Sequence, residues 1–161
     1  MKILNLVLGY IVVSILGVLF HFAYDFLNID LLKIVFPMNE SVFEHLKLII
    51  FPCLIYMIID LFVTKDRTRI FESYISGIFI SMLFMIVGYY TYSGIIGTDI
   101  SWANIVLFFI CIGIVFVFRY KKITLFDVSN SVIVLIILLI IIELFTFYPA
   151  DINLFTNFLY H

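Results

Sequence analysis

The stretch FPMNESVFEHLKLIIFP, from Phe36 to Pro52, decides the fold, because it joins a dense polar cluster directly to an apolar run. Two glutamates, a histidine and a lysine lie within eight residues of it, from Glu40 to Lys47. The residues from Ser41 to Glu44 have the S-x-x-E spacing of a capping box, which satisfies free amide groups at the start of a helix. We therefore expect a helix to begin at Ser41 and to continue through the apolar residues that follow.

The composition of the chain excludes an ordinary soluble protein. Of its 161 residues, 65% are hydrophobic and 12% are charged, and the mean hydropathy is +1.26. Soluble domains carry roughly 45–50% apolar and about 25% charged residues. Membrane lipid is therefore the expected surrounding of most of the chain, and the net charge of −2 gives no indication of a nucleic-acid partner.

Five segments are long and apolar enough to cross a membrane, since a spanning helix needs about 20 mostly apolar residues. They cover roughly residues 3–27, 41–63, 70–93, 101–119 and 126–147. Open strands are excluded at this hydrophobicity, because lipid cannot satisfy their backbone groups. We predict an all-α fold in which residues 1–161 form one polytopic transmembrane bundle of about five helices.

The lysines and arginines predict the orientation in the membrane, because cytoplasmic loops are enriched in these residues. With five spans, seven of the nine basic residues fall on one side, together with four acidic residues. The other side carries two basic and seven acidic residues. We predict that the first side, which includes the N-terminus, lies inside the cell and that the C-terminus lies outside.

Ionisable side chains from three of the predicted helices gather at the predicted outer side. They are His21 and Asp25 in the first helix, Glu40, Glu44, His45 and Lys47 around the start of the second, Glu143 near the end of the fifth, and Asp151 in the tail. Such groups are costly near hydrocarbon, so they usually pair with one another around a bundle interior or a water-filled cavity. The sequence thus predicts a polar pocket at the outer face.

A metal site is one interpretation of this pocket. Zinc binds histidine nitrogen and carboxylate oxygen, and catalytic zinc sites keep one position open for water. The candidate ligands of zinc or another divalent metal are His21, His45, Asp25 and Glu40. The spacing is not that of a known zinc signature, since Glu44-His45 lacks the second histidine of H-E-x-x-H.

The other polar residues of the pocket have predicted roles beside the metal. A carboxylate that is not bound to the metal, Glu143 or Glu44, would act as a general base. The side chains of Lys47, Asn39 and Asp151 would contact the substrate or take part in ion pairs, with Lys47 steadying an anionic headgroup.

The alternative interpretation of these residues is structural. The carboxylate of Glu44 would belong to the helix cap at Ser41, and Lys47 would form an ion pair with Glu44, Glu143 or Asp25. The two histidines would then be hydrogen-bonded packing residues. Under this interpretation the pocket fixes the register of the helices and carries no chemistry.

Several short motifs of this chain form a recurring pattern. The most specific is N-E-S-V-F-E-H-L-K from Asn39 to Lys47, followed by Phe51-Pro52; the others are His21-Phe22, Tyr92-Ser93-Gly94-Ile95, and Phe145-Thr146 with Pro149. Through these motifs the whole chain resembles a family of small bacterial integral membrane proteins whose function is unassigned. The resemblance implies only the fold and the grouping of these residues, and it brings no activity with it. From the spans and the basic residues we expect a multi-pass protein of the bacterial cytoplasmic membrane.

The chain departs from the family pattern near its end. Relatives resemble F-T-x-x-P-P-H there, whereas this chain has Ala150 and Asp151 where a proline and a histidine would stand. If that histidine were a metal ligand, Asp151 would have to replace it. The pocket is also similar, by analogy of site only, to membrane-embedded zinc hydrolases of the alkaline ceramidase type. Their three-histidine zinc set is not matched, since only His21 and His45 are well placed here.

Two functions follow from these alternatives. The first is a metal-dependent hydrolase that acts on a lipid-like substrate at the outer leaflet. The second is a non-enzymatic membrane subunit or small transporter whose polar cluster is a structural ion-pair network. The middle of each predicted helix is nearly uncharged, which argues against an ion path through the whole bundle, because such paths place ionisable groups near the bilayer midplane.

Overall fold

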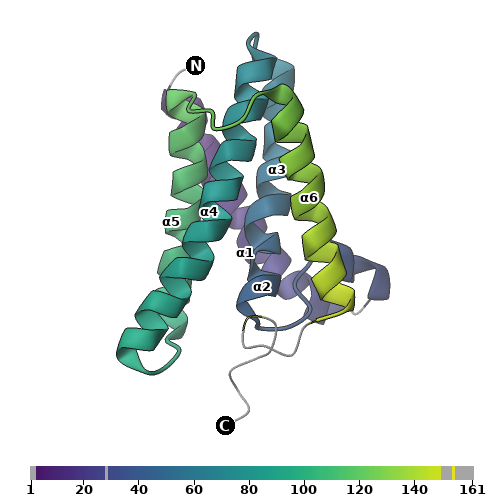
Figure 1. Cartoon of the computed structure of the whole chain (residues 1–161), viewed down its shortest axis with the longest axis vertical. Helices are drawn as coiled ribbons and strands as arrows, with labels where there is room; N and C mark the ends of the chain where they lie inside the picture. The colour runs from purple at the N-terminus through teal and green to yellow at the C-terminus, as the bar shows by residue number, and fades with distance from the viewer. Residues whose placement is uncertain (1–2, 28, 150–153, 155–161) are drawn as a thin grey trace.

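The computed structural model describes residues 3–27, 29–149 and 154, and long helices dominate it (Figure 1). In chain order the elements are α1 (Ile3–Leu27), the 3-10 helix η1 (Asp30–Ile34), α2 (Val42–His45), α3 (Lys47–Val63), α4 (Arg67–Ile96), α5 (Ser101–Lys121) and α6 (Val128–Phe147). Within the described residues, five helical stretches are long and apolar enough to cross a membrane, with α2 and α3 together forming one of them. The predicted all-α bundle is confirmed.

The helix bounds differ from the predicted ones at the polar ends of the spans. The helix expected over 41–63 is divided at Leu46 into α2 and α3, and Ser41 caps α2 by accepting a hydrogen bond from the backbone N–H of Glu44. The helix expected over 70–93 begins earlier and continues until Gly97, whose φ of 81° ends it. Apolar composition marks only the part of a helix inside lipid, so it misses turns that extend into the polar boundary.

Helices α4 and α5 form the most extensive helix pair, and small residues allow their close contact. A Cβ added to Gly77 would lie 3.0 Å from the Cα of Val115, so the two backbones nearly touch at this point. One turn further on, the Ser81 hydroxyl donates a hydrogen bond of 2.7 Å to the carbonyl of Cys111. The small residues Gly77 and Ser81 thus allow the close helix packing that such residues provide in membrane proteins.

Helix α1 lies against α3 and α5 through two further glycines. A Cβ on Gly9 would come within 2.6 Å of the rings of Tyr56 and Phe116, and one on Gly17 would come within 2.5 Å of the Phe108 ring. The outward-facing surfaces of the helices expose large apolar side chains. On α6 these include Ile133, Ile136, Ile137 and Ile140. Lipid is the solvent that this outer surface fits.

The two ends of the bundle differ in charge. One end, here called the basic end, contains the α3–α4 connection and the C-terminal end of α5 (Figure 1). Its basic residues are Lys65, Arg67, Arg69, Arg119, Lys121 and Lys122. The other end, here called the acidic end, carries η1, the start of α2 and the α4–α5 turn (Figure 1), with Asp30, Glu40 and Asp99. The predicted orientation depends on this difference in charge between the two ends. The orientation itself stays a prediction.

A buried ion pair joins three helices near the basic end. The Arg119 Nε lies 2.5 Å from Oδ2 of Asp60, and the side chains are 3% and 4% exposed. The same carboxylate accepts hydrogen bonds from the hydroxyls of Tyr74 and Thr64 at 3.1 Å and 3.0 Å. Arg119 is one of the seven basic residues on the predicted inner side, but the structure buries it on α5 as the partner of Asp60.

Replacing Arg119 with methionine should strongly destabilise the bundle. The change leaves the buried Asp60 carboxylate without its cation, and breaking such a pair typically costs about 3–5 kcal/mol. The measurement is the thermal unfolding midpoint in mild detergent. The control is Lys121→Met, because Lys121 is exposed in the same turn of α5. An equal, small shift in both variants would contradict a stabilising role for the ion pair.

Candidate metal centre

Three of the predicted metal ligands come together at the acidic end. His21 lies near the end of α1, Glu40 precedes α2, and His45 is the last residue of α2. The Nε2 atoms of the two histidines are 3.2 Å apart. Oε2 of Glu40 lies 3.6 Å from Nε2 of His21 and 3.4 Å from Nε2 of His45. These three residues are called the metal triangle below.

The dimensions of the metal triangle match those of a tetrahedral metal site. Zinc lies about 2.0–2.2 Å from its nitrogen and oxygen ligands, which places two ligand atoms of a tetrahedral ion about 3.4 Å apart. The separations in the triangle are 3.2, 3.4 and 3.6 Å. One ion could therefore contact all three atoms with little movement of the side chains.

The backbone of Ser41 orients one of the two histidines. Nδ1 of His45 lies 2.8 Å from the Ser41 carbonyl oxygen. Because a carbonyl oxygen only accepts hydrogen bonds, Nδ1 carries a proton, and Nε2 of neutral His45 directs its lone pair into the triangle. Metal-bound histidines are held in the same way by a hydrogen bond from the nitrogen that does not contact the metal.

The carboxylate of Glu40 is ionised under ordinary conditions. When His45 is protonated, its hydrogen bond to Glu40 holds the pKa of that carboxyl below its usual value, and the charges on His45 and His21 lower it further, while partial burial opposes them. In the absence of a metal, a proton can therefore be shared among the three side chains. A metal and this proton would compete for the same atoms.

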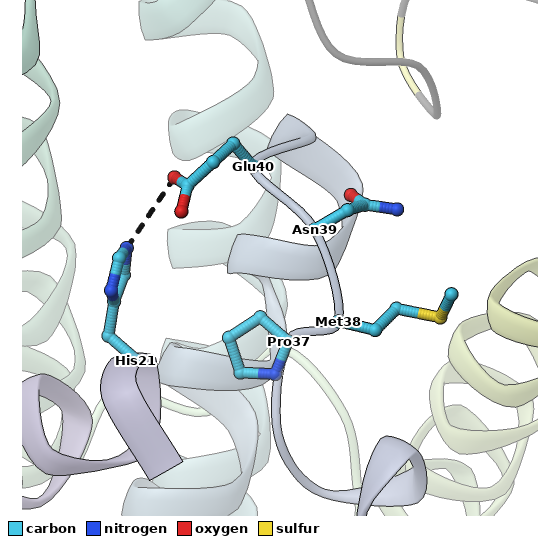
Figure 2. A pocket seen from close by; sticks show the side chains of 5 residues that line it. All are labelled: His21, Pro37, Met38, Asn39 and Glu40. Carbon is cyan, nitrogen blue, oxygen red and sulfur yellow. Dashed lines mark ion pairs between the residues drawn. The ribbon is translucent and has the colours of Figure 1, made fainter. Parts of the chain in front are cut away.

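A small cavity adjoins the metal triangle. It measures about 20 Å³ and is lined by His21, Pro37, Met38, Asn39 and Glu40. Figure 2 shows the Glu40 carboxylate directed toward His21, while the side chains of Met38 and Asn39 point away from this pair. Since about 10–15 Å³ is enough for one water, the cavity has room for one small ligand beside the triangle.

The side chain of Asn39 stabilises the turn before α2. Its Oδ1 accepts a hydrogen bond of 2.8 Å from the backbone N–H of Ser41. Asparagine commonly bonds to the backbone two residues further on in this way. The contact fixes the short connection that carries Glu40, and a role of Asn39 toward substrate stays a prediction.

A second polar cluster is buried beside the triangle. Oε2 of Glu44 accepts hydrogen bonds from the Met38 backbone N–H at 3.0 Å and from the Lys47 ammonium at 2.8 Å. Oε1 accepts a hydrogen bond of 2.8 Å from the Thr146 hydroxyl. Glu44, Lys47 and Thr146 are called the Glu44 anchor below. The predicted ion pair between Lys47 and Glu44 is confirmed.

The Glu44 anchor connects the segments that carry the metal triangle to the rest of the bundle. Lys47 has no exposed surface, and its ammonium also donates a hydrogen bond to the carbonyl of Lys33 in η1. Through Glu44 the same cluster reaches the backbone before α2 and, by way of Thr146, the end of α6. The enclosed ammonium favours the ion-pair interpretation of Lys47 over contact with a substrate headgroup.

Thr146 was missed as a partner by the sequence analysis. It lies 102 residues from Glu44. A threonine inside an apolar helix most often donates its hydroxyl to its own helix, and the single hydroxyl proton of Thr146 is shared between Oε1 of Glu44 and the carbonyl of Ile142. The sequence signal for Thr146 was the Phe145-Thr146 pair of the family pattern. That pattern does not indicate which residue Thr146 contacts.

The remaining predicted site residues lie apart from the triangle or outside the described part of the chain. Glu143 is within electrostatic range of Lys47 and Glu44, and its buried carboxylate oxygens have no hydrogen-bond partner among the described residues. The backbone of Asp25 belongs to α1, but its side chain is not described, and Asp151 lies outside the described residues. The structure therefore groups Glu143 with the Glu44 anchor.

Replacing Thr146 with valine should destabilise the acidic end. The change removes a hydrogen bond to a buried carboxylate, and bonds to charged groups contribute about 1.5–3 kcal/mol. The measurement is the free energy of unfolding in detergent. Thr146→Ser is the control, because it keeps the hydroxyl and should recover most of the loss. An unfolding free energy of Thr146→Val equal to that of the unchanged protein would contradict a stabilising role of the hydroxyl.

Comparison with known proteins identifies the family of this chain and gives it no activity. No curated protein and no solved structure matches the sequence. Residues 3–160 match the profile of DUF6512, which is described as a family of unknown function. Because this match covers nearly the whole chain, the protein belongs to the DUF6512 family.

Proposed function

We propose that this protein is a metal-dependent hydrolase in which the metal triangle holds a divalent ion such as zinc. The observation that carries the proposal is the set of three separations, 3.2, 3.4 and 3.6 Å, between the ligand atoms of His21, His45 and Glu40. Two neutral histidines and one carboxylate form a ligand set that also occurs in catalytic zinc sites.

The arrangement leaves room for catalysis, because three protein ligands leave one position for water or substrate. When bound, such an ion lowers the pKa of its water to about 7 and polarises a carbonyl group. The reaction would add water across an acyl ester or amide bond, giving a carboxylic acid and an alcohol or amine. His45 is held in the required tautomer by the Ser41 carbonyl, and the cavity of about 20 Å³ gives space beside the ligands.

Of the two predicted general bases, Glu44 does not fit this proposal. Its side chain is 4% exposed and paired with the enclosed Lys47 ammonium, and hydrogen bonds from Met38 and Thr146 hold it within the Glu44 anchor, away from a reacting water. Glu143 does not fit either, because the structure groups it with the Glu44 anchor and apart from the metal triangle.

The proposal places the metal triangle at the outer face of the bacterial cytoplasmic membrane. It is supported by the concentration of lysine and arginine at the opposite, basic end of the bundle (Figure 1), since cytoplasmic loops are enriched in these residues. The substrate would then be a lipid-like molecule of the outer leaflet.

The second candidate function is a non-enzymatic membrane subunit. The Glu44 anchor favours it, because a buried ion pair supported by several hydrogen bonds is what a structural network would contain. In that case the metal triangle would be a second hydrogen-bonded group without a metal. The metal content of the purified protein separates the two candidates.

The protein purified in mild detergent, without a chelator or a histidine tag, should contain about one zinc or other transition metal ion per chain. His45→Ala should lose the metal, because it removes one of three ligands. His161→Ala is the matched control, since it removes the remaining histidine of the sequence and should keep the metal. Elemental analysis makes the measurement. Absence of metal in every sample, even after zinc is added back, would favour the structural subunit.

The zinc affinity should fall steeply on acidification below about pH 6.5, the usual pKa of histidine. Protons then compete for the Nε2 atoms, whereas Glu40, whose pKa is lowered, stays ionised until the solution is more acidic than its usual value near 4.5. Competition with a chromophoric chelator between pH 5 and 8 gives the affinity. A constant affinity over this range would exclude histidine ligands.

A further inference from the structure

We infer that the site takes an uncharged lipid, which reaches it sideways from the bilayer past an apolar rim beside the metal triangle. This inference rests on the proposed function and names the substrate class of the same site. The rim consists of four residues. Phe22 and Phe26 lie near the end of α1, Ile29 lies just before η1, and Leu31 lies within η1.

The rim exposes large apolar side chains beyond the membrane span of α1. The exposed fractions of Phe22, Phe26, Ile29 and Leu31 are 62%, 87%, 51% and 73%. The apolar span of this helix ends at Tyr24, so three of the four lie past it. Figure 1 shows η1 at the acidic end, on the side where α6 ends. A segment of this kind buries its apolar face in the boundary between headgroups and acyl chains.

The bundle holds the rim in a fixed position next to the metal triangle. The rings of His21 and Phe22 are in edge contact, with 4.9 Å between their centroids, so a rim residue adjoins a ligand. The Lys47 ammonium bonds to the Lys33 carbonyl in η1, and the rings of Phe20 and Phe36 pack with 4.7 Å between their centroids. The rim continues the lipid-facing surface of α1, because the exposed residues Ile15, Leu19, Phe22 and Phe26 follow one another at the three- to four-residue spacing of one helix face.

The charges at this end disfavour an anionic headgroup. Among the described residues, only two lysines and no arginine lie at the acidic end. Lys47 is enclosed by Glu44, and the ammonium of Lys33 lies 2.7 Å from the carboxylate of Asp30. The exposed charges are the carboxylates of Asp30, Glu40 and Asp99. Apart from a metal ion held in the triangle, a lipid phosphate would find no unpaired cation here, so no Lys or Arg side chain is free to hold an anionic headgroup.

The combination of an apolar entrance and an acidic surface selects an uncharged lipid with an acyl ester or amide, such as a diacylglycerol. A phosphate-binding site would instead present Arg or Lys side chains in a position to contact the headgroup. The rim also suits contact with lipid rather than with water, because it continues the membrane-facing apolar surface of α1.

Quenching of a tryptophan in the rim by brominated lipids tests both parts of the inference. The single native tryptophan is replaced by Trp102→Phe, and Leu31→Trp is added to it. The protein is placed in phosphatidylcholine nanodiscs that contain the same small mole fraction of either brominated diacylglycerol or brominated phosphatidylglycerol. We expect brominated diacylglycerol to quench the fluorescence at least about twice as strongly. Thr98→Trp, in the exposed turn after α4, is the matched control and should be quenched little by either lipid.

Two results would overturn the inference. Equal or stronger quenching by brominated phosphatidylglycerol would exclude selection of an uncharged lipid. Absence of quenching by both lipids, with an emission maximum like that of the Thr98→Trp control, would show that the rim faces water or a protein partner. Neither result depends on metal binding or hydrolysis. A protein without metal would therefore overturn the proposed function and leave the lipid contact to be decided by the quenching alone.

Discussion

The buried ion pair between Glu44 and Lys47 is the interaction on which the acidic end of the bundle depends. Removing two charges from water costs several kcal/mol per ion, and this cost is offset only when the pair is well aligned and further hydrogen bonds support it. Here the Met38 backbone, the Thr146 hydroxyl and the Lys33 carbonyl supply such partners. The requirement for them fixes η1, the start of α2 and the end of α6 relative to one another.

The metal triangle differs from this anchor in the way its polar atoms are arranged. In the anchor, hydrogen bonds within the protein engage both carboxylate oxygens of Glu44. In the triangle, the Nε2 atoms of His21 and His45 and one oxygen of Glu40 face one another across 3.2–3.6 Å beside a small cavity. Adjacent residues of one short helix therefore have different tasks. Glu44 holds α2 in place, and His45 directs its Nε2 toward His21 and Glu40.

The same physical rule operates at the basic end, where Asp60 and Arg119 join α3 to α5 with the help of Tyr74 and Thr64. Residues of this kind could not be predicted as partners from one sequence. Asp60 lies in an apolar helix and Arg119 beside a basic loop, so nothing local distinguishes an arginine that pairs inside the bundle from one that faces water. The pair Glu44–Lys47 could be predicted, because three residues of spacing on a helix bring side chains together.

The sequence by itself determined the class of the fold and the end at which the polar residues gather. Hydrophobic segments of spanning length must form helices in lipid, and an alternation of five spans places His21, Glu40 and His45 on one side of the membrane. Only the tertiary structure decided which of these side chains touch. Contact depends on how α1 and α2 pack and on where the connection before α2 turns. Those distances are set by glycine contacts, by the buried bonds of Glu44 and by the Asn39 turn, which act between residues far apart in the chain or through backbone atoms that carry no sequence signal.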